Sequence, residues 1–120
     1  MLAAATLMAG MIAGGALPFA ATAAASCSTC ARAFDGASYT GTEKDFSQGV
    51  GNADLSTISF DNKISSIEQT LAVGHGFIWW TDADYQGSSF KACATAAYPS
   101  LGSPYNNALS SVEATLSCPD

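Results

Sequence analysis

The chain is poor in positive charge and has almost no histidine. It carries four Lys and Arg residues and one His against ten Asp and Glu residues, which gives a formal net charge of −6 at pH 7. No basic patch is available, and this argues against nucleic acid or an anionic membrane surface as a partner. A serine nucleophile signature and a phosphate-binding glycine loop are also missing. Catalysis therefore has no foothold in the sequence, and we expect a protein that is not an enzyme.

Charge is absent altogether from residues 1–25, which consist mainly of Ala, Leu, Met, Ile and Gly and end in a run of small residues. This pattern predicts a secretory signal peptide that is cleaved between about Ala23 and Ser26, although the usual basic start is missing. A membrane-spanning helix is the alternative, but glycines and a proline interrupt the stretch and no basic flank follows it. We expect residues 1–25 to be removed, and residues 26–120 to form one secreted domain without membrane contact.

The four cysteines predict two disulfides, because an even number in a short secreted chain is typical of a disulfide framework. Three pairings are possible, and the sequence does not choose among them. Cys27 and Cys30 form a C-x-x-C pair that could suggest an oxidoreductase, yet they lack the strand and helix of a thioredoxin-type site. A zinc site is poorly supported, since there is no second close pair of ligands. We expect structural disulfides that join the two ends of the chain, or one end to Cys93.

Helical periodicity is hard to find after residue 30, where Gly, Ser, Asn and Asp recur every few residues between short apolar segments. This pattern favours an all-β sandwich or barrel of short strands. Four strands in each half would fit a Greek key that is used twice. The predicted strands are Ala31–Phe34, Glu43–Phe46, Thr57–Phe60 and Ser66–Leu71, followed by Gly76–Trp80, Ser88–Cys93, a poorly marked strand near Tyr98–Leu101, and Ser111–Leu116.

An internal repeat divides the chain into two halves, at about residues 31–72 and 76–117. A block of six residues, Asp61-Asn62-Lys63-Ile64-Ser65-Ser66, recurs 45 positions later as Asn106-Asn107-Ala108-Leu109-Ser110-Ser111. An aromatic and glycine pattern recurs at an offset of 46, with Phe34, Tyr39 and Gly41 in the first half and Trp80, Tyr85 and Gly87 in the second. Each half is too small to bury its own apolar face alone, so both must pack as one body.

These two patterns resemble the βγ-crystallin family, specifically its secreted or microbial calcium-binding members. Each half has the aromatic, four residues, aromatic, any residue, glycine signature of that family, and then the block that ends in two serines. The resemblance implies an all-β fold in which two Greek-key motifs pack as a single β-sandwich, with calcium sites at one end.

The resemblance also implies a set of calcium ligands. Ser65 and Ser110 would give hydroxyl oxygens, Lys63 and Ala108 backbone carbonyls, and the pairs Asp61-Asn62 and Asn106-Asn107 side-chain oxygens; Asp35 and Thr81 would add backbone carbonyls from the opposite motif. Calcium takes about six to eight oxygens of all these kinds. Only Asp61 brings a formal charge, which predicts weak binding. The competing interpretation is that both blocks are ordinary turns.

The leading hypothesis is therefore a secreted calcium-binding module whose ions stabilise the fold, with a structural, stress or surface role. The alternative is a secreted protease inhibitor or an antifungal, killer-toxin-like protein on the same fold. For an inhibitor, the proline-flanked segment Tyr98–Pro104 would be the contact loop. The partner would be an extracellular protein or a cell-wall glycan, in addition to calcium ions.

Overall fold

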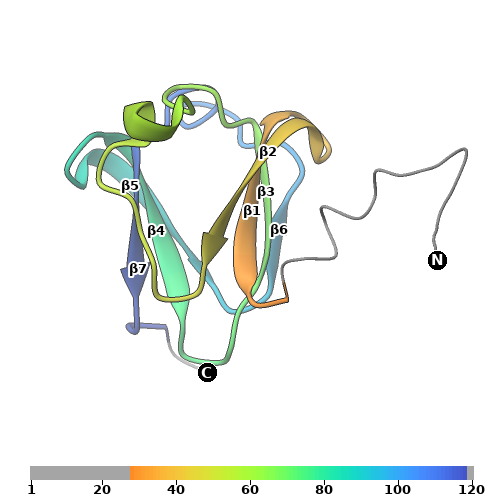
Figure 1. Ribbon diagram of the computed structural model, residues 1–120, viewed down its shortest axis with the longest axis vertical. Helices are drawn as coiled ribbons and strands as arrows, with labels where there is room; N and C mark the ends of the chain where they lie inside the picture. Colours follow the sequence, from red (N-terminus) through yellow and green to blue (C-terminus); the bar gives the residue numbers. More distant parts are fainter. Residues whose placement is uncertain (1–27, 119–120) are drawn as a thin grey trace, which may run out of the picture.

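The computed structural model describes residues 28–118, so the predicted signal peptide and Cys27 lie outside the described residues. The described chain forms seven β-strands and one short 3-10 helix (Figure 1). These elements are β1 (Cys30–Gly36), β2 (Thr40–Ser47), η1 (Leu55–Ile58), β3 (Ser66–Thr70), β4 (Gly76–Asp82), β5 (Gln86–Cys93), β6 (Ala96–Tyr98) and β7 (Ser111–Thr115). None of the residues from 28 to 118 forms a helix that is long and apolar enough to cross a membrane.

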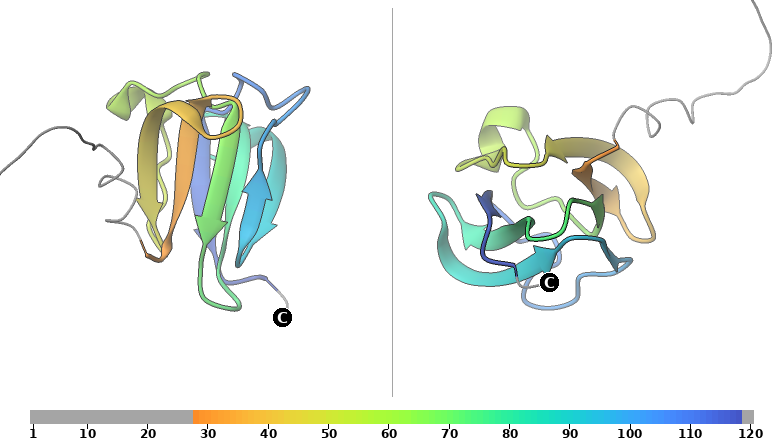
Figure 2. Two further views of the ribbon diagram at one scale, coloured as in Figure 1. Left: turned by 90° about the vertical axis from the view of Figure 1, so that its right-hand side faces the viewer. Right: turned by 90° about the horizontal axis from the view of Figure 1, so that it is seen from below.

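The strands form two antiparallel sheets that lie against each other as two layers (Figures 1 and 2). The first sheet has the order β2-β1-β3-β6, and the second has the order β5-β4-β7. In Figure 1 the strands run between a loop-rich end at the top and the end at the bottom where the C-terminus lies. The prediction of an all-β sandwich is confirmed.

Each half of the repeat lends a segment to the sheet of the other half. Strand β6 belongs to the second half but pairs with β3 of the first, with Ile67 opposite Tyr98. In return, Asn52 of the first half forms a bridge with Val112 of β7, with N–O distances of 2.7 and 2.9 Å. Gly51 permits this approach, because a Cβ at Gly51 would lie only 2.5 Å from the carbonyl oxygen of Val112. The exchange interlocks the two halves, so neither sheet is complete without both.

The core lies between the sheets and is filled by the inward-facing residues of both. Trp79 of β4 is fully buried, and its ring meets Phe46 of β2 edge to face at 5.6 Å. Trp80 points to the opposite side of the same strand, where its indole Nε1 donates to Glu113 at 3.1 Å. One tryptophan of the adjacent pair therefore joins the two layers, as the alternation of side chains along a strand predicts.

The predicted strand at Thr57–Phe60 is wrong, because the chain forms η1 at Leu55–Ile58 instead. Asp54 caps this helix by accepting from the backbone N and the hydroxyl of Ser56, which also lowers the Asp54 pKa. Ser59 then ends the helix in the left-handed conformation. Local hydrogen bonds from short polar side chains outweigh the β-propensity of this segment.

The strand predicted near Tyr98–Leu101 is displaced, since β6 covers Ala96–Tyr98. It ends at Tyr98, because the next residue, Pro99, has no backbone N–H to offer to a strand ladder. Leu101 donates its own N–H to the carbonyl of Ser65 at 3.1 Å instead. The poor strand pattern of this segment thus reflects a connection that crosses between the halves.

A disulfide joins Cys93, at the end of β5, to Cys118 near the C-terminus. It packs over Gly76, where a Cβ would lie 2.4 Å from the Cys118 sulfur and 2.6 Å from the Ala92 carbonyl oxygen. Cys30 is disulfide-bonded as well. The expected structural role of the cysteines is thereby confirmed for the Cys93–Cys118 pair.

Candidate metal centre

The two repeated blocks lie side by side at the loop-rich end of the sandwich, where their loops cross at the top of Figure 1. Asn62 of the first block donates its backbone N–H to Leu109 of the second at 3.0 Å. Asn107 returns the same bond to Ile64 at 2.9 Å. The blocks are thus related by an approximate two-fold axis, and each makes the same contacts to the other.

Both bonds depend on an unusual backbone conformation at the second position of each block. Asn62 has a φ of 58° and Asn107 a φ of 57°. Asn tolerates this left-handed region better than most residues, because its short polar side chain can bond locally. The repeated Asn therefore supplies a backbone turn as well as an amide side chain.

The serine at the fifth position of each block contacts the asparagine at the second position of the other block. We call Ser65 and Ser110 the position-5 serines, and Ser66 and Ser111 the position-6 serines. The Ser65 hydroxyl donates to Asn107 Oδ1 at 3.0 Å, and the Ser110 hydroxyl donates to Asn62 Oδ1 at 3.4 Å. We call the first arrangement the Ser65 centre (Ser65, Asn106, Asn107 and Ala108) and the second the Ser110 centre (Ser110, Asp61, Asn62 and Lys63). Each centre combines residues of both halves, a cross-pairing that the linear order of the blocks conceals.

The serine at the sixth position of each block has a structural role in a hairpin. Ser66 is fully buried, donates to Gly36 O at 2.6 Å and accepts from Tyr39 N at 2.9 Å. Ser111 is equally buried, and it makes the equivalent bonds with Asp82 O and Tyr85 N, at 2.6 and 3.1 Å. These two serines fix the bends of the β1–β2 and β4–β5 hairpins.

Asp35 and Thr81 use their side chains to close the same hairpins. Asp35 Oδ1 accepts from Thr42 N, and Thr81 Oγ1 accepts from Ser88 N, both at 2.9 Å. Their backbone follows directly on Phe34 and Trp80, whose carbonyls accept from Ser65 N and Ser110 N at 2.8 and 2.9 Å. Asp35 and Thr81, the predicted carbonyl ligands, thus each follow a residue that is hydrogen-bonded to Ser65 or Ser110.

The carboxylate of Asp61 carries an unsatisfied oxygen at the Ser110 centre. Its Oδ1 is buried and has no hydrogen-bond partner among residues 28–118, whereas Oδ2 accepts from Asn62 Nδ2 at 3.2 Å. A buried carboxylate oxygen without a partner is costly, and native structures rarely leave one in place. A bound cation would remove this cost, so the residues present fit a metal ion.

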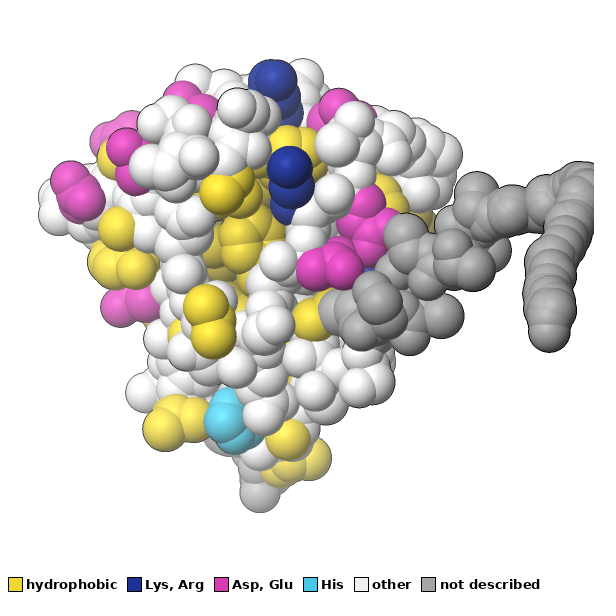
Figure 3. Space-filling view, viewed as in Figure 1, with side chains coloured by type: hydrophobic (Ala, Val, Ile, Leu, Met, Phe, Trp, Pro, Cys, Tyr) yellow, Lys and Arg dark blue, Asp and Glu magenta, His cyan; other side chains and the backbone are white. Residues whose placement is uncertain are grey.

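The donor set indicates a hard cation. Hydroxyl, amide, carboxylate and carbonyl oxygens are the ligands of calcium rather than of zinc or copper. Among residues 28–118, no three His, Cys, Asp or Glu side chains lie close enough together to hold a metal, so a metal here would depend mainly on amide, hydroxyl and carbonyl oxygens. The surface around the domain carries scattered acidic and few basic side chains on the face shown in Figure 3. Such a surface attracts cations weakly over its whole extent.

Two further residues contact the centres, and neither of them was predicted from the sequence. Leu55 donates its backbone N–H to the carbonyl of Ser110 at 2.9 Å, and Leu101 donates to that of Ser65 at 3.1 Å. They stand 46 positions apart, the offset at which the aromatic pattern repeats. That offset was the available signal for their equivalent roles.

No protein-family model matches the chain, and no curated protein sequence matches it. Solved structures do. A βγ-crystallin from Ciona intestinalis is 24% identical, with a TM-score of 0.59 over 70% of this chain and 96% of that one. The N-terminal domain of Protein S is 24% identical, with a TM-score of 0.60 over 77% and 100%. A double mutant of a βγ-crystallin domain from Clostridium beijerinckii is 16% identical, with a TM-score of 0.61 over 74% and 99%. The domain described by residues 28–118 therefore has the βγ-crystallin fold.

Proposed function

We propose that the protein is a secreted calcium-binding module of the βγ-crystallin type, in which calcium stabilises the fold for a structural, stress or surface role. The observation that carries the proposal is the pairing of Ser65 with Asn107 and of Ser110 with Asn62 across the two halves. The unpartnered buried oxygen of Asp61 supports it independently.

The Ser110 centre would hold calcium through the Ser110 hydroxyl, the side chains of Asp61 and Asn62, and the carbonyl of Lys63. The Ser65 centre would use the equivalent atoms of Ser65, Asn106, Asn107 and Ala108, and the carbonyls of Asp35 and Thr81 complete the set. A bound ion supplies positive charge that holds together oxygens of both halves. Binding would therefore oppose the separation of the halves that unfolding requires.

The expected gain in stability is modest. Few formal charges place each centre near the affinity of extracellular calcium modules. With a dissociation constant of about 0.1 mM and free calcium of about 1 mM, one site adds roughly 1.4 kcal/mol to the free energy of unfolding. On this fold, a double mutant of clostrillin in which two serines are replaced by histidines is in complex with nickel, whereas the two centres of this chain contain no histidine.

The test is a calorimetric titration of the chelator-treated protein with calcium, with the melting temperature followed in parallel. We expect heat from weak binding and a higher melting temperature. Magnesium is the matched ion, because its strict octahedral demand fits this varied oxygen set less well. The double variant Ser65→Ala, Ser110→Ala should lose both responses, whereas the exposed Ser88→Ala should keep them. Absence of heat and of a melting shift in the unaltered protein would refute the proposal.

Secretion is part of the same proposal. The uncharged segment 1–25 and the Cys93–Cys118 disulfide both fit an oxidising compartment outside the cytosol. Sequencing the N-terminus of the exported protein should find a start near Ser26. Recovery of the protein only inside the cell, with its thiols reduced, would contradict secretion.

We propose protease inhibition as the alternative function, because the segment from Pro99 to Pro104 is exposed except at Leu101 and is held by backbone bonds. Pro99 O accepts from Ser38 N at 2.8 Å, and Leu101 N donates to Ser65 O at 3.1 Å. A loop that is ordered before it binds loses little entropy in a complex. Assays against a panel of secreted proteases at micromolar inhibitor should reveal slow cleavage of substrate, and full activity of every protease would end this alternative.

A further inference from the structure

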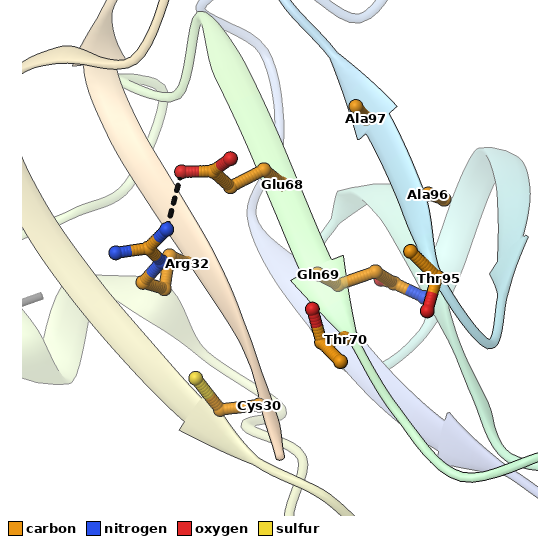
Figure 4. A pocket seen from close by; sticks show the side chains of 8 residues that line it. All are labelled: Cys30, Arg32, Glu68, Gln69, Thr70, Thr95, Ala96 and Ala97. Atoms are coloured by element: carbon orange, nitrogen blue, oxygen red, sulfur yellow. Dashed lines mark hydrogen bonds and ion pairs between the residues drawn. The ribbon is translucent and has the colours of Figure 1, made fainter. Parts of the chain in front are cut away.

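A groove of about 320 Å³ lies on the first sheet, at the edge of strand β3 that faces β6, and the function proposed above makes no use of it. Figure 4 shows the side chains that line it, which come from β1, β3, β6 and the residue that precedes β6. These residues are Cys30, Arg32, Glu68, Gln69, Thr70, Thr95, Ala96 and Ala97.

Short and small residues create the groove. Strand β6 has three residues, and its last pairing with β3 joins Ala96 to Gln69. Thr70 therefore extends beyond the ladder between β3 and β6, and the small exposed side chain of Ala97 leaves space open on this face, whereas Ala96 packs against the core. The floor of the groove is apolar, whereas its walls carry polar groups.

One wall is an ion pair. Arg32 Nη2 donates to Glu68 Oε1 at 2.5 Å, and both side chains keep partial access to solvent. Figure 4 shows the two side chains facing each other from β1 and β3. A guanidinium has five N–H donors and a carboxylate two acceptor oxygens, so each partner retains bonding capacity for a ligand.

The other polar wall contains an amide with an unused acceptor. Gln69 is only 3% exposed, and its Nε2 donates to the carbonyls of Ala92 and Ala94 at 3.1 and 2.9 Å. These two bonds fix the orientation of the amide, and its Oε1 then finds no partner in the described part of the chain. A buried acceptor without a donor is costly, and this oxygen is too enclosed for more than a water molecule to reach it.

The repeat supplies an internal comparison. The equivalent place on the second sheet is also hollow, with a volume of about 310 Å³, but its lining includes Gly49 and Ala114. These residues stand at the positions of Thr95 and Gln69, and Ile78 stands at that of Arg32. His75 and Thr115 also line this second hollow, so the fold forms it without an equivalent of the Arg32–Glu68 pair and of the Gln69 amide. These two features of the first groove are therefore not a requirement of the fold.

The charges around the groove disfavour an anion. Asp45 lies opposite Arg32 on β2, and Glu43 lies on the same strand. A hydrogen bond with Asp45, together with burial, raises the Glu43 pKa from 4.5 to about 7, and both Arg32 and Glu68 act on it. Carboxyl groups thus outnumber the one guanidinium, which disfavours an anion. The Arg32 guanidinium lines the groove itself and repels a cation there, so a neutral ligand with many hydroxyls is the best match.

We propose that this groove binds one neutral sugar ring, either a free monosaccharide or a residue of a glycan. Its volume lies at the small end of the range for ligand pockets, about 300 to 1,000 Å³, which suits a single ring. Glu68 accepts from sugar hydroxyls, Arg32 donates to them, and the hydroxyls of Thr70 and Thr95 do either. The methyl group of Ala97, which is the exposed one of the Ala96 and Ala97 pair, contacts the C–H face of the ring.

The test is an NMR titration of the purified protein with the methyl glycosides of glucose, galactose, mannose and N-acetylglucosamine. We expect one of them to shift the amides of Thr70, Thr95 and Ala97 saturably, with a dissociation constant in the millimolar range. Ala97→Leu fills the groove and should abolish binding. Glu68→Gln should weaken it about tenfold, which corresponds to about 1.4 kcal/mol for a bond to a charged group. Glu113→Gln changes the equivalent residue of the second sheet and should leave binding unaltered.

Two results would overturn the proposal. One is that none of the four glycosides shifts these amides, whether or not ethylamine, a small organic cation, shifts them. The other is that the shifts persist in both Ala97→Leu and Thr95→Ala. Sedimentation with insoluble chitin or cell-wall polymer, lost in Ala97→Leu, would identify a glycan residue as the source of the ring, whereas binding of the glycoside alone would identify a free sugar. The titration is repeated in chelator, because the groove shares no residue with the Ser65 and Ser110 centres.

Discussion

The hydroxyl of Ser65 lies 3.0 Å from the amide oxygen of Asn107, although 42 positions separate the two residues in the chain. The contact depends on the exchange of segments between the halves, which brings the end of one block beside the start of the other. The equivalent contact of Ser110 with Asn62 is longer, at 3.4 Å. The two centres are therefore similar in plan and unequal in detail, and the inequality can be tested.

The first prediction concerns the single carboxylate of the centres. Asp61→Asn should weaken calcium binding at the Ser110 centre about tenfold or more, because the negative charge is lost and one of the two carboxylate oxygens becomes an NH2 group that cannot bind the ion. Asn106→Asp, the matched change in the other block, should strengthen the Ser65 centre by a similar factor. Calorimetric titration of both variants measures the two affinities separately.

Equal and unchanged affinities in these variants would show that the first position of each block does not contact the ion. The variants also report on the fold, since Asn106→Asp should not alter the melting temperature in chelator. A loss of stability without calcium would point to a structural use of the amide instead.

The part of the structure that could be predicted from the sequence is the part that is encoded locally. Gly41 and Gly87 each adopt a φ of 86°, as the hairpin signature requires, and the Phe34 and Tyr39 rings meet at 5.9 Å. The prediction of a strand at Thr57–Phe60 was wrong because capping by Asp54 outweighs the strand-like pattern of this segment. The cross-pairing of the centres could not be read from the blocks, since it follows from a long-range exchange that involves β6 and Asn52.

The second prediction distinguishes the effects of substituting the position-5 serines, Ser65 and Ser110, from those of substituting the position-6 serines, Ser66 and Ser111. Ser66→Ala and Ser111→Ala should each lower the free energy of unfolding by about 1 to 3 kcal/mol, because each leaves a hairpin donor and acceptor unpaired. Calcium affinity measured on the folded fraction should stay the same. Ser65→Ala and Ser110→Ala should show the reverse pattern, with lost affinity and little change in the chelator-treated protein. Denaturant unfolding with and without calcium distinguishes the two classes, and identical behaviour of all four variants would refute the division.

The third prediction is a dependence of stability on pH that comes from Glu43. Its hydrogen bond with Asp45 and its burial raise the pKa to about 7 in the folded protein, above the ordinary 4.5. Folding thus favours the protonated carboxyl, and the associated stability is present below about pH 4.5 and is lost as the pH rises through about 7. The melting temperature of the chelator-treated protein should therefore fall between about pH 5 and pH 8.

Glu43→Gln is the control for this pH dependence, because the amide cannot ionise and keeps the side-chain volume. The variant should melt at a less pH-dependent temperature and should be the more stable protein at about pH 8. Glu113→Gln, on the second sheet, should retain the full dependence. A wild-type curve that rises from about pH 5 to pH 8 would contradict the assigned direction.

The fourth prediction concerns the contact between Gly76 and the disulfide of Cys93 and Cys118. Removing the disulfide with Cys93→Ala and Cys118→Ala should cost roughly 3 kcal/mol, as expected for a loop that spans 25 positions. Gly76→Ala should also destabilise the protein, because its methyl group would meet the Cys118 sulfur and the Ala92 carbonyl. In the disulfide-free background the first of these clashes is relieved, so Gly76→Ala should cost less there than in the oxidised protein. Thermal unfolding of the two backgrounds, each with and without Gly76→Ala, measures this coupling, and strictly additive losses would show that the backbone carbonyl alone excludes a side chain at this position.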